Sequence, residues 1–186
     1  MLDAESGARM TKLIEDAASR GDSVGAVLET AISGLPAGIG EPWFDSVESV
    51  ISHAAFSLGG VKGVEFGAGF AAADMKGSEC NDPLRVSGGR IVTTTNNNGG
   101  VNGGITNGMP IVFRCAVKPT PSIAQQQDTV DFIKNENTQL SIHGRHDPAI
   151  IRRICPVLDS VAALCVADML SLRYGTDVLT KGVDDR

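Results

Sequence analysis

The sequence Asn96-Asn97-Asn98-Gly99-Gly100-Val101-Asn102-Gly103-Gly104-Ile105-Thr106-Asn107-Gly108 lies between two predicted strands, residues 89–95 and 109–117. Two strands can be joined by about two to five residues, and glycine is entropically expensive to order. We therefore expect something to come close to this backbone. Glycines make room for a planar or phosphorylated ligand, and asparagines add amide donors and acceptors. By composition alone, a disordered Asn/Gly linker is an equal alternative.

Outward from this loop, the spacing of apolar residues predicts alternating helices and strands. The predicted strands are 23–33, 61–66, 90–95, 110–117 and 138–142, and the predicted helices are 3–20, 42–58 and 149–174. Pro156 lies inside the last helical pattern, so one kinked helix and two separate helices are both possible. We expect residues 68–89 to be irregular, residues 125–137 to be polar surface and the tail 175–186 to fray.

Length and composition indicate one compact domain over residues 1–186. The net charge of −6 leaves no basic patch, so we expect no nucleic-acid partner. No uninterrupted apolar run approaches the roughly 20 residues that span a bilayer, and the N-terminus has no signal-peptide pattern. We expect a cytoplasmic protein with no membrane association. The cysteines have no metal-site spacing and are expected to be buried free thiols, namely Cys80, Cys115, Cys155 and Cys165.

Two polar segments suggest chemistry. Lys118-Pro119-Thr120-Pro121-Ser122 follows an apolar strand directly, and its ammonium and hydroxyl groups suit a phosphate or a carboxylate. In His143-Gly144-Arg145-His146-Asp147-Pro148, Arg145 and Asp147 would share one side of an extended backbone. A guanidinium there could hold a phosphate and a carboxylate could pass a proton. The alternatives are a strand exit with incidental polar residues and an ordinary ion pair in a turn. The two histidines are a weak signal for a metal.

Five blocks, taken in order, resemble chorismate synthase. They are Gly40-Glu41-Pro42, Val61-Lys62-Gly63-Val64-Glu65, the Asn/Gly loop ending in Gly103-Gly104-Ile105-Thr106-Asn107-Gly108, Lys118-Pro119-Thr120 and Gly144-Arg145-His146-Asp147-Pro148. The resemblance extends from the first helix over nearly the whole chain, and it covers the C-terminal half of the family's protein. It implies an α+β fold: half of a β-α-β sandwich, with an antiparallel sheet packed on long helices.

The resemblance also implies a lyase that converts 5-enolpyruvylshikimate 3-phosphate to chorismate and phosphate by 1,4-anti elimination, within aromatic amino acid biosynthesis. The family requires reduced FMN and forms homotetramers. Reduction of the flavin links the family to NADP, and the sequence leaves open whether the enzyme or an external reductase performs it.

Site residues follow from the resemblance position by position. The family's flavin contacts correspond to Gly59, Gly60, Gly103, Lys118, Pro119, Thr120, Pro121, Ser122 and Arg145. Asp147 matches the aspartate that relays a proton at the flavin, and Arg145 also lies near the substrate's anions. The family often has Glu where Asp159 stands.

The family's two catalytic histidines and a further flavin-binding segment belong to its N-terminal half, so we expect this chain to be inactive, or nearly so, by itself. A different hypothesis is a non-catalytic assembly module that dimerises or pairs with a separate N-terminal half. A third is a generic phosphate-binding domain, but a strand and not a helix follows the Gly-rich loop, unlike a P-loop.

Overall fold

The computed structural model describes residues 3–182, and its centre is a three-stranded antiparallel sheet in the order β1-β7-β2. The central strand β7 (Ile111–Val117) pairs with β1 (Ala26–Ile32) and, past a register shift at Gly63, with β2 (Val61–Phe66). Side chains along β7 alternate between buried and less buried, as in a sheet whose core lies on one face. The strands predicted at 23–33, 61–66 and 110–117 are confirmed.

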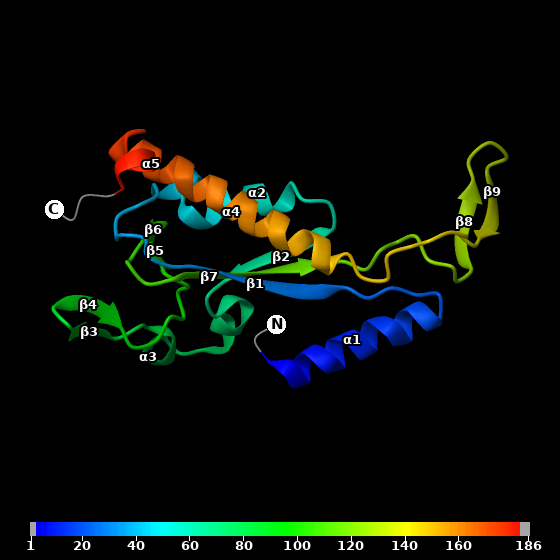
Figure 1. Cartoon of the computed structure of the whole chain (residues 1–186), viewed down its shortest axis with the longest axis horizontal. Helices are drawn as coiled ribbons and strands as arrows, with labels where there is room; N and C mark the ends of the chain where they lie inside the picture. The colour runs from blue at the N-terminus through cyan, green and yellow to red at the C-terminus, as the bar shows by residue number, and fades with distance from the viewer. Residues whose placement is uncertain (1–2, 183–186) are drawn as a thin grey trace.

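Helices cover one face of this sheet. The helical elements are α1 (Ala4–Ser19), η1 (Trp43–Asp45), α2 (Val47–Phe56), η2 (Gly69–Asp74), α3 (Gly77–Cys80), α4 (Ile151–Tyr174) and α5 (Val178–Lys181). The helices α2 and α4 lie together above the sheet, whereas α1 runs on its other side (Figure 1). Phe113, Ile51 and Leu158 meet in the core between sheet and helices, all at most 1% exposed. This arrangement confirms the predicted α+β class, with an antiparallel sheet packed on helices.

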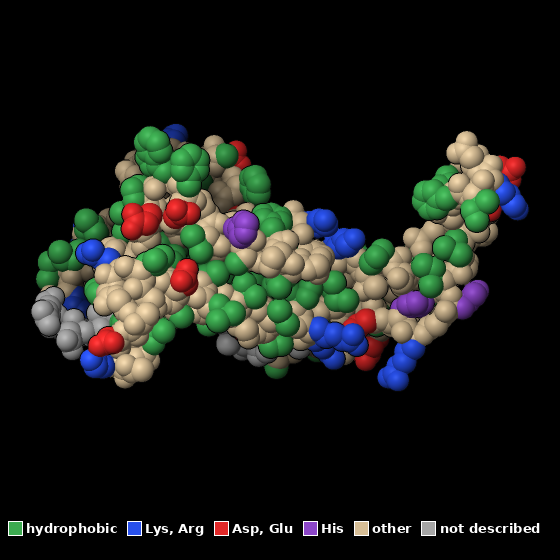
Figure 2. Space-filling model, turned by 90° about the horizontal axis from the view of Figure 1, so that it is seen from above, with side chains coloured by type: hydrophobic (Ala, Val, Ile, Leu, Met, Phe, Trp, Pro, Cys, Tyr) green, Lys and Arg blue, Asp and Glu red, His purple; other side chains and the backbone are tan. Residues whose placement is uncertain are grey.

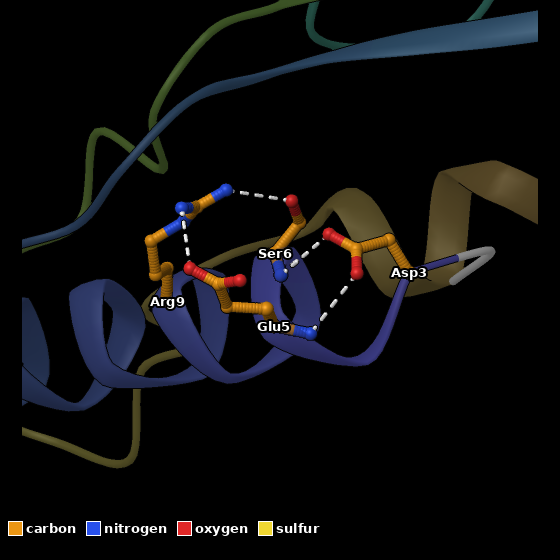
Figure 3. Close-up of polar contacts among 4 residues, drawn as sticks. All are labelled: Asp3, Glu5, Ser6 and Arg9. Atoms are coloured by element: carbon orange, nitrogen blue, oxygen red, sulfur yellow. Dashed lines mark hydrogen bonds and ion pairs between the residues drawn. The ribbon is translucent and has the colours of Figure 1, made fainter.

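The first helix begins where its sequence supplies a cap. The carboxylate of Asp3 accepts hydrogen bonds from the backbone N–H groups of Glu5 and Ser6, and Arg9 binds both side chains one turn later (Figure 3). These groups satisfy donors that have no partner inside the helix. The apolar face predicted for this helix is covered only in part: Ala17 is buried, but Met10 and Leu13 are exposed.

The helix predicted over 42–58 is divided. Pro42 precedes the short η1, in which Trp43 has a positive φ of 74°. The helix α2 then starts after Ser46, whose hydroxyl oxygen accepts a hydrogen bond from the Ser49 N–H. A serine that can cap a helix therefore decides where α2 begins, and not the proline.

The long helix α4 decides one open alternative and corrects one expectation. It continues through Pro156 as one helix. Pro156 is its sixth residue, and the missing N–H removes one intrahelical hydrogen bond, to the Arg152 carbonyl. The helix is also long and apolar enough to cross a membrane by length and composition, with a window of mean hydropathy 1.7, although we expected no such segment. Asp159 and Asp168 interrupt the apolar run without lowering its mean hydropathy much. The helix also contributes Leu158, Ala162 and Met169 to the core.

Two hairpins were predicted only in part. β4 (Arg90–Thr93) lies in the strand expected over 90–95, and β9 (Glu136–Leu140) overlaps the strand expected over 138–142. Their partners were not predicted, since β3 (Leu84–Ser87) falls in the region expected to be irregular and β8 (Gln127–Asp131) in the region expected to be polar surface. The β8–β9 hairpin projects from one end of the molecule (Figure 1). Neither hairpin has a buried residue, so the burial that produces a strand pattern in sequence is missing. In the tail, α5 is helical, and residues 183–186 lie outside the described residues.

The Asn/Gly loop is ordered, and what comes close to its glycines is the protein's own backbone. A Cβ on Gly99 would lie 2.5 Å from the Gly67 nitrogen, and one on Gly100 would lie 2.4 Å from the Pro110 oxygen. The loop also contains the short pair β5 (Val101–Asn102) and β6 (Ile105–Thr106). The expectation of a ligand against this whole loop is therefore wrong for these two glycines, because intramolecular packing already explains them.

One carboxylate organises the start of this loop. Asp82 accepts hydrogen bonds from the Thr95 hydroxyl at 2.6 Å, from the backbone N–H groups of Asn97 and Asn98, and from the Asn98 side-chain amide. Burial by itself would raise the pKa of Asp82, but these hydrogen bonds outweigh it, so the pKa of this carboxyl lies below its ordinary value.

The cysteines match the expectation only in part. All four are free thiols. Cys115 is buried, and burial raises the pKa of its thiol to about 11. Cys155 is exposed on α4 and not buried as expected, because it lies on the face of the helix that turns away from the sheet.

We expect Asp82→Asn to lower the free energy of unfolding by about 1–3 kcal/mol near neutral pH, since the loop amides lose a charged acceptor. The pKa of Asp82 is lowered in the folded state. Its contribution is therefore complete above the unfolded value of 3.8 and is lost as the pH falls through the lower folded value. Urea unfolding of the parent chain and of Asp82→Asn, measured from neutral pH down through the pKa of Asp82, should show their free energies of unfolding converging in acid. The exposed Asp74→Asn is the control, and a constant difference at every pH would contradict this account.

Candidate functional site

The predicted segment 118–122 lies at the end of β7, beside two other parts of the chain. The Lys118 backbone N–H donates to the Gly60 carbonyl oxygen at 2.8 Å. The Ser23 hydroxyl donates to the Thr120 carbonyl oxygen at 2.6 Å. The strand exit is therefore fixed to the turn before β2 on one side and to the segment before β1 on the other.

The second predicted segment runs next to the first. The Ile142 N–H donates to the Ile123 carbonyl oxygen at 3.4 Å, and the Val24 N–H donates to the Pro148 carbonyl oxygen at 2.9 Å. Between these segments lies a cavity of about 130 Å³, lined among others by Ser23, Ser122, Gly144, His146 and Asp147. We call Gly60, Lys118–Ser122 and Gly144–Pro148 the exit site.

Cations of the exit site are available to a ligand. Lys118 and Arg145 are exposed, and neither forms an ion pair within residues 3–182. Several Lys and Arg side chains gather over this end of the molecule, near the base of the β8–β9 hairpin (Figure 2). The Thr120 hydroxyl oxygen is buried and has no hydrogen-bond partner, which is uncommon for a buried polar atom. These groups suit a small oxyanion.

Two groups hold the Asp147 carboxylate, and the cation that pairs with it is not the expected Arg145. One carboxylate oxygen lies 3.0 Å from Nε of Arg153, in the first turn of α4. The other accepts a hydrogen bond from the Ala149 N–H at 3.3 Å. Arg145, expected to share a side with Asp147, is not its partner, because the turn at Ala149 directs the carboxylate toward the helix. Sequence reasoning missed Arg153, although two arginines beginning a helix are an unusual signal.

The two histidines of this segment have different environments. Nε2 of His146 lies within hydrogen-bond distance, 3.2 Å, of the Ile142 carbonyl oxygen, whereas His143 is exposed. Among residues 3–182, no group of three or more His, Cys, Asp or Glu side chains is placed to hold a metal ion.

Two predicted glycines differ from the rest of the set. Gly59 adjoins the exit site but is exposed, with open space where a Cβ would stand. Gly103 lies in the turn between β5 and β6, at the other end of β7 from Lys118 (Figure 1). A strand of seven residues is about 23 Å long, so this chain does not bring Gly103 together with Lys118 and Asp147. The resemblance places Gly103, Lys118 and Asp147 together among the site residues, and the structure separates Gly103 from the other two.

Asp159 has a structural contact. The Thr30 hydroxyl on β1 lies 3.3 Å from its carboxylate, within hydrogen-bond distance. Thr30 is almost fully buried, so this contact satisfies its hydroxyl and joins α4 to the edge of the sheet.

Fold and site together define an α+β protein in which two exposed cations, Lys118 and Arg145, form no ion pair among residues 3–182 and precede an oriented carboxylate, Asp147, in the sequence. Comparison with known proteins is more specific. The family model described as chorismate synthase matches residues 1–171. The chain is 48% identical to the chorismate synthase of Methanosarcina acetivorans over 93% of its own length and 47% of the relative. It is 51% identical to that of Chitinophaga pinensis over 96% of its length and 52% of the relative.

A solved structure agrees with these relatives. It is described as a crystal structure of chorismate synthase, and it aligns with a TM-score of 0.74 at 31% identity, covering 93% of this chain and 45% of that one. The chain belongs to the chorismate synthase family, and it spans about half the length of the curated relatives it matches.

We expect inorganic phosphate to bind at the exit site and to perturb the backbone amide NMR signals of residues 118–122 and 144–148. Replacing Lys118 or Arg145 by alanine should weaken this binding several-fold, because each removes one unpaired positive charge. Lys76→Ala, at the start of α3, is the matched control. Equal binding by all three variants, or shifts confined to the Asn/Gly loop, would contradict this placement.

Proposed function

We propose that this chain is the C-terminal half of a chorismate synthase and supplies one wall of the site for reduced FMN and 5-enolpyruvylshikimate 3-phosphate. The full enzyme would convert this substrate to chorismate and phosphate by 1,4-anti elimination. Family membership over nearly the whole chain supports the reaction class. The observation that carries the proposal is that Ser122, at the end of the first predicted segment, lines one cavity together with Gly144, His146 and Asp147 of the second.

The residues present fit part of a flavin phosphate or substrate site. A cavity of about 130 Å³ has room for one anionic group but is smaller than the roughly 300–1,000 Å³ of a complete ligand pocket. The Lys118 ammonium is exposed and forms no ion pair within residues 3–182, so it can bind phosphate oxygens. Further walls must come from the other half of the enzyme or from another subunit of the proposed homotetramer.

Reduced FMN, when bound, would supply transient electron donation and a place for the departing ring hydrogen. Within this chain, Asp147 can hold and release a proton at the carboxylate oxygens that face the cavity. Arg145 can bind the anionic groups of the substrate, and Lys118 with Thr120 can fix a phosphate. Asp147 is then the proposed catalytic group, and the other residues position the ligands. Reduction of the flavin by an NADP-linked route is part of the same proposal.

We expect a fusion of this chain to the N-terminal half of the Methanosarcina acetivorans relative to release phosphate from the substrate under anaerobic conditions with reduced FMN. In that fusion, Asp147→Asn should lower the rate by about 10²–10⁴-fold, as for a lost general acid or base. Asp128→Asn, on the β8–β9 hairpin, is the matched control. Phosphate release and flavin fluorescence are the measurements. A correctly folded fusion that binds reduced FMN but has no turnover would refute the proposed reaction.

A second candidate function is an assembly module, and the outer surface of α4 favours it. Leu164 and Leu172 are 70% and 77% exposed, although such apolar side chains are usually covered. An open groove of about 610 Å³ runs between β1, α4 and α5, with small apolar residues such as Ala162, Ala163 and Val166 in its wall. Burying this surface would stabilise a complex with another protein chain.

We expect light scattering to show self-association of this chain above its mass of 19.4 kDa, or a 1:1 complex once the N-terminal half is added. The double variant Leu164→Lys with Leu172→Lys should weaken that association, since each ammonium would have to be buried in the interface. Leu84→Lys, on the β3–β4 hairpin, changes an equally exposed leucine elsewhere and is the control. A chain that stays monomeric at every concentration, with and without the other half, would exclude the assembly role.

A further inference from the structure

Arg153 occupies a position in α4 that the electrostatics of a helix disfavour for a cation. It lies in the first turn of α4, next to Arg152, and that turn contains no acidic residue. The N-terminus of a helix carries partial positive charge, so cations there are unfavourable. Arg153 nevertheless directs its Nε to Asp147 at 3.0 Å. Its placement is therefore explained by the carboxylate and not by the helix.

The carboxylate of Asp147 has a defined orientation as a result. The Ala149 N–H holds one oxygen at 3.3 Å and Arg153 holds the other. The Asp147 side chain is 27% exposed, so water does not screen it completely, while Arg153 is 80% exposed. The remaining lone pairs of the carboxylate face the cavity shared with Ser23 and Ser122.

We infer that Arg153 is the positioning residue for Asp147: it fixes the orientation of this carboxylate, which leaves Arg145 free to bind an anion. The catalytic meaning of this division rests on the proposed function, whereas the ion pair itself does not. Asp22 and His146 line the same cavity as Asp147, and Arg145 lies two residues before it in the chain.

The carboxyl carbon NMR signal of Asp147, recorded in this chain at neutral pH, tests the ion pair without flavin or substrate. Arg153→Gln should shift this signal, because the carboxylate loses its guanidinium partner. Arg153→Lys should restore part of the shift. Arg152→Gln, one residue earlier on the helix, should leave the signal unchanged, and thermal unfolding checks that each variant is folded.

Two outcomes would overturn the inference. One is an Asp147 carboxyl signal that does not change in Arg153→Gln. The other is a larger change in Arg145→Gln, which would return the pairing to the arginine favoured by sequence. In the fusion enzyme, Arg153→Gln should lower kcat about 10-fold or more with little change in KM, whereas Arg145→Gln should raise KM. If the parent fusion is inactive, the proposed function fails, and the carboxyl signal of Asp147 still decides the role of Arg153.

Discussion

The burial of β7 is the constraint on which the rest of the structure depends. Ile111, Phe113, Cys115 and Val117 all point to the face covered by α2 and α4, and all are at most 4% exposed. Phe113 stacks on Phe66 of the neighbouring strand, with ring centroids 5.5 Å apart. Each aromatic side chain buries a large apolar area, so a one-residue slip of β7 would expose the whole set. The register of β7 therefore also fixes where Lys118 leaves the sheet.

The same constraint explains which elements could be predicted from sequence. β7, β2 and α4 have strong apolar patterns because they border the core, and their existence was predicted correctly. The β3–β4 and β8–β9 hairpins do not border the core, so only one strand of each was predicted. Pairing determines β3 and β8 and leaves little trace in their residue types. The division of the helix at 42–58 depends on one capping serine, a local effect that periodicity does not include.

The candidate site shows a different limit of prediction from sequence. Glycine clears space for a ligand and for another stretch of backbone equally well, so the Asn/Gly loop gave the same signal for both. Only the positions of Gly67 and Pro110 show that the neighbour of the loop is the protein itself. Lys118 and Asp147 were proposed from their side-chain chemistry and from the family resemblance, and their roles at the site stay predictions. Arg153 was missed because its pairing depends on the turn from Asp147 to Ala149, which spacing does not reveal.

The residues that build the sheet core and the residues proposed to bind ligands lie in different parts of this chain. This half of the family protein contains a complete sheet core, so β7 can fix the exit site without the other half. Arg153 neutralises Asp147 within the same half, and Lys118 and Arg145 remain as excess positive charge in a chain whose net charge is −6. In the proposed site these exposed cations would attract an anion locally against the overall field, and salt would screen that attraction. Catalytic groups that act as one unit lose their effect together when some are missing. Under the proposed function, this chain would hold an anion in a defined place, while turnover would depend on further residues.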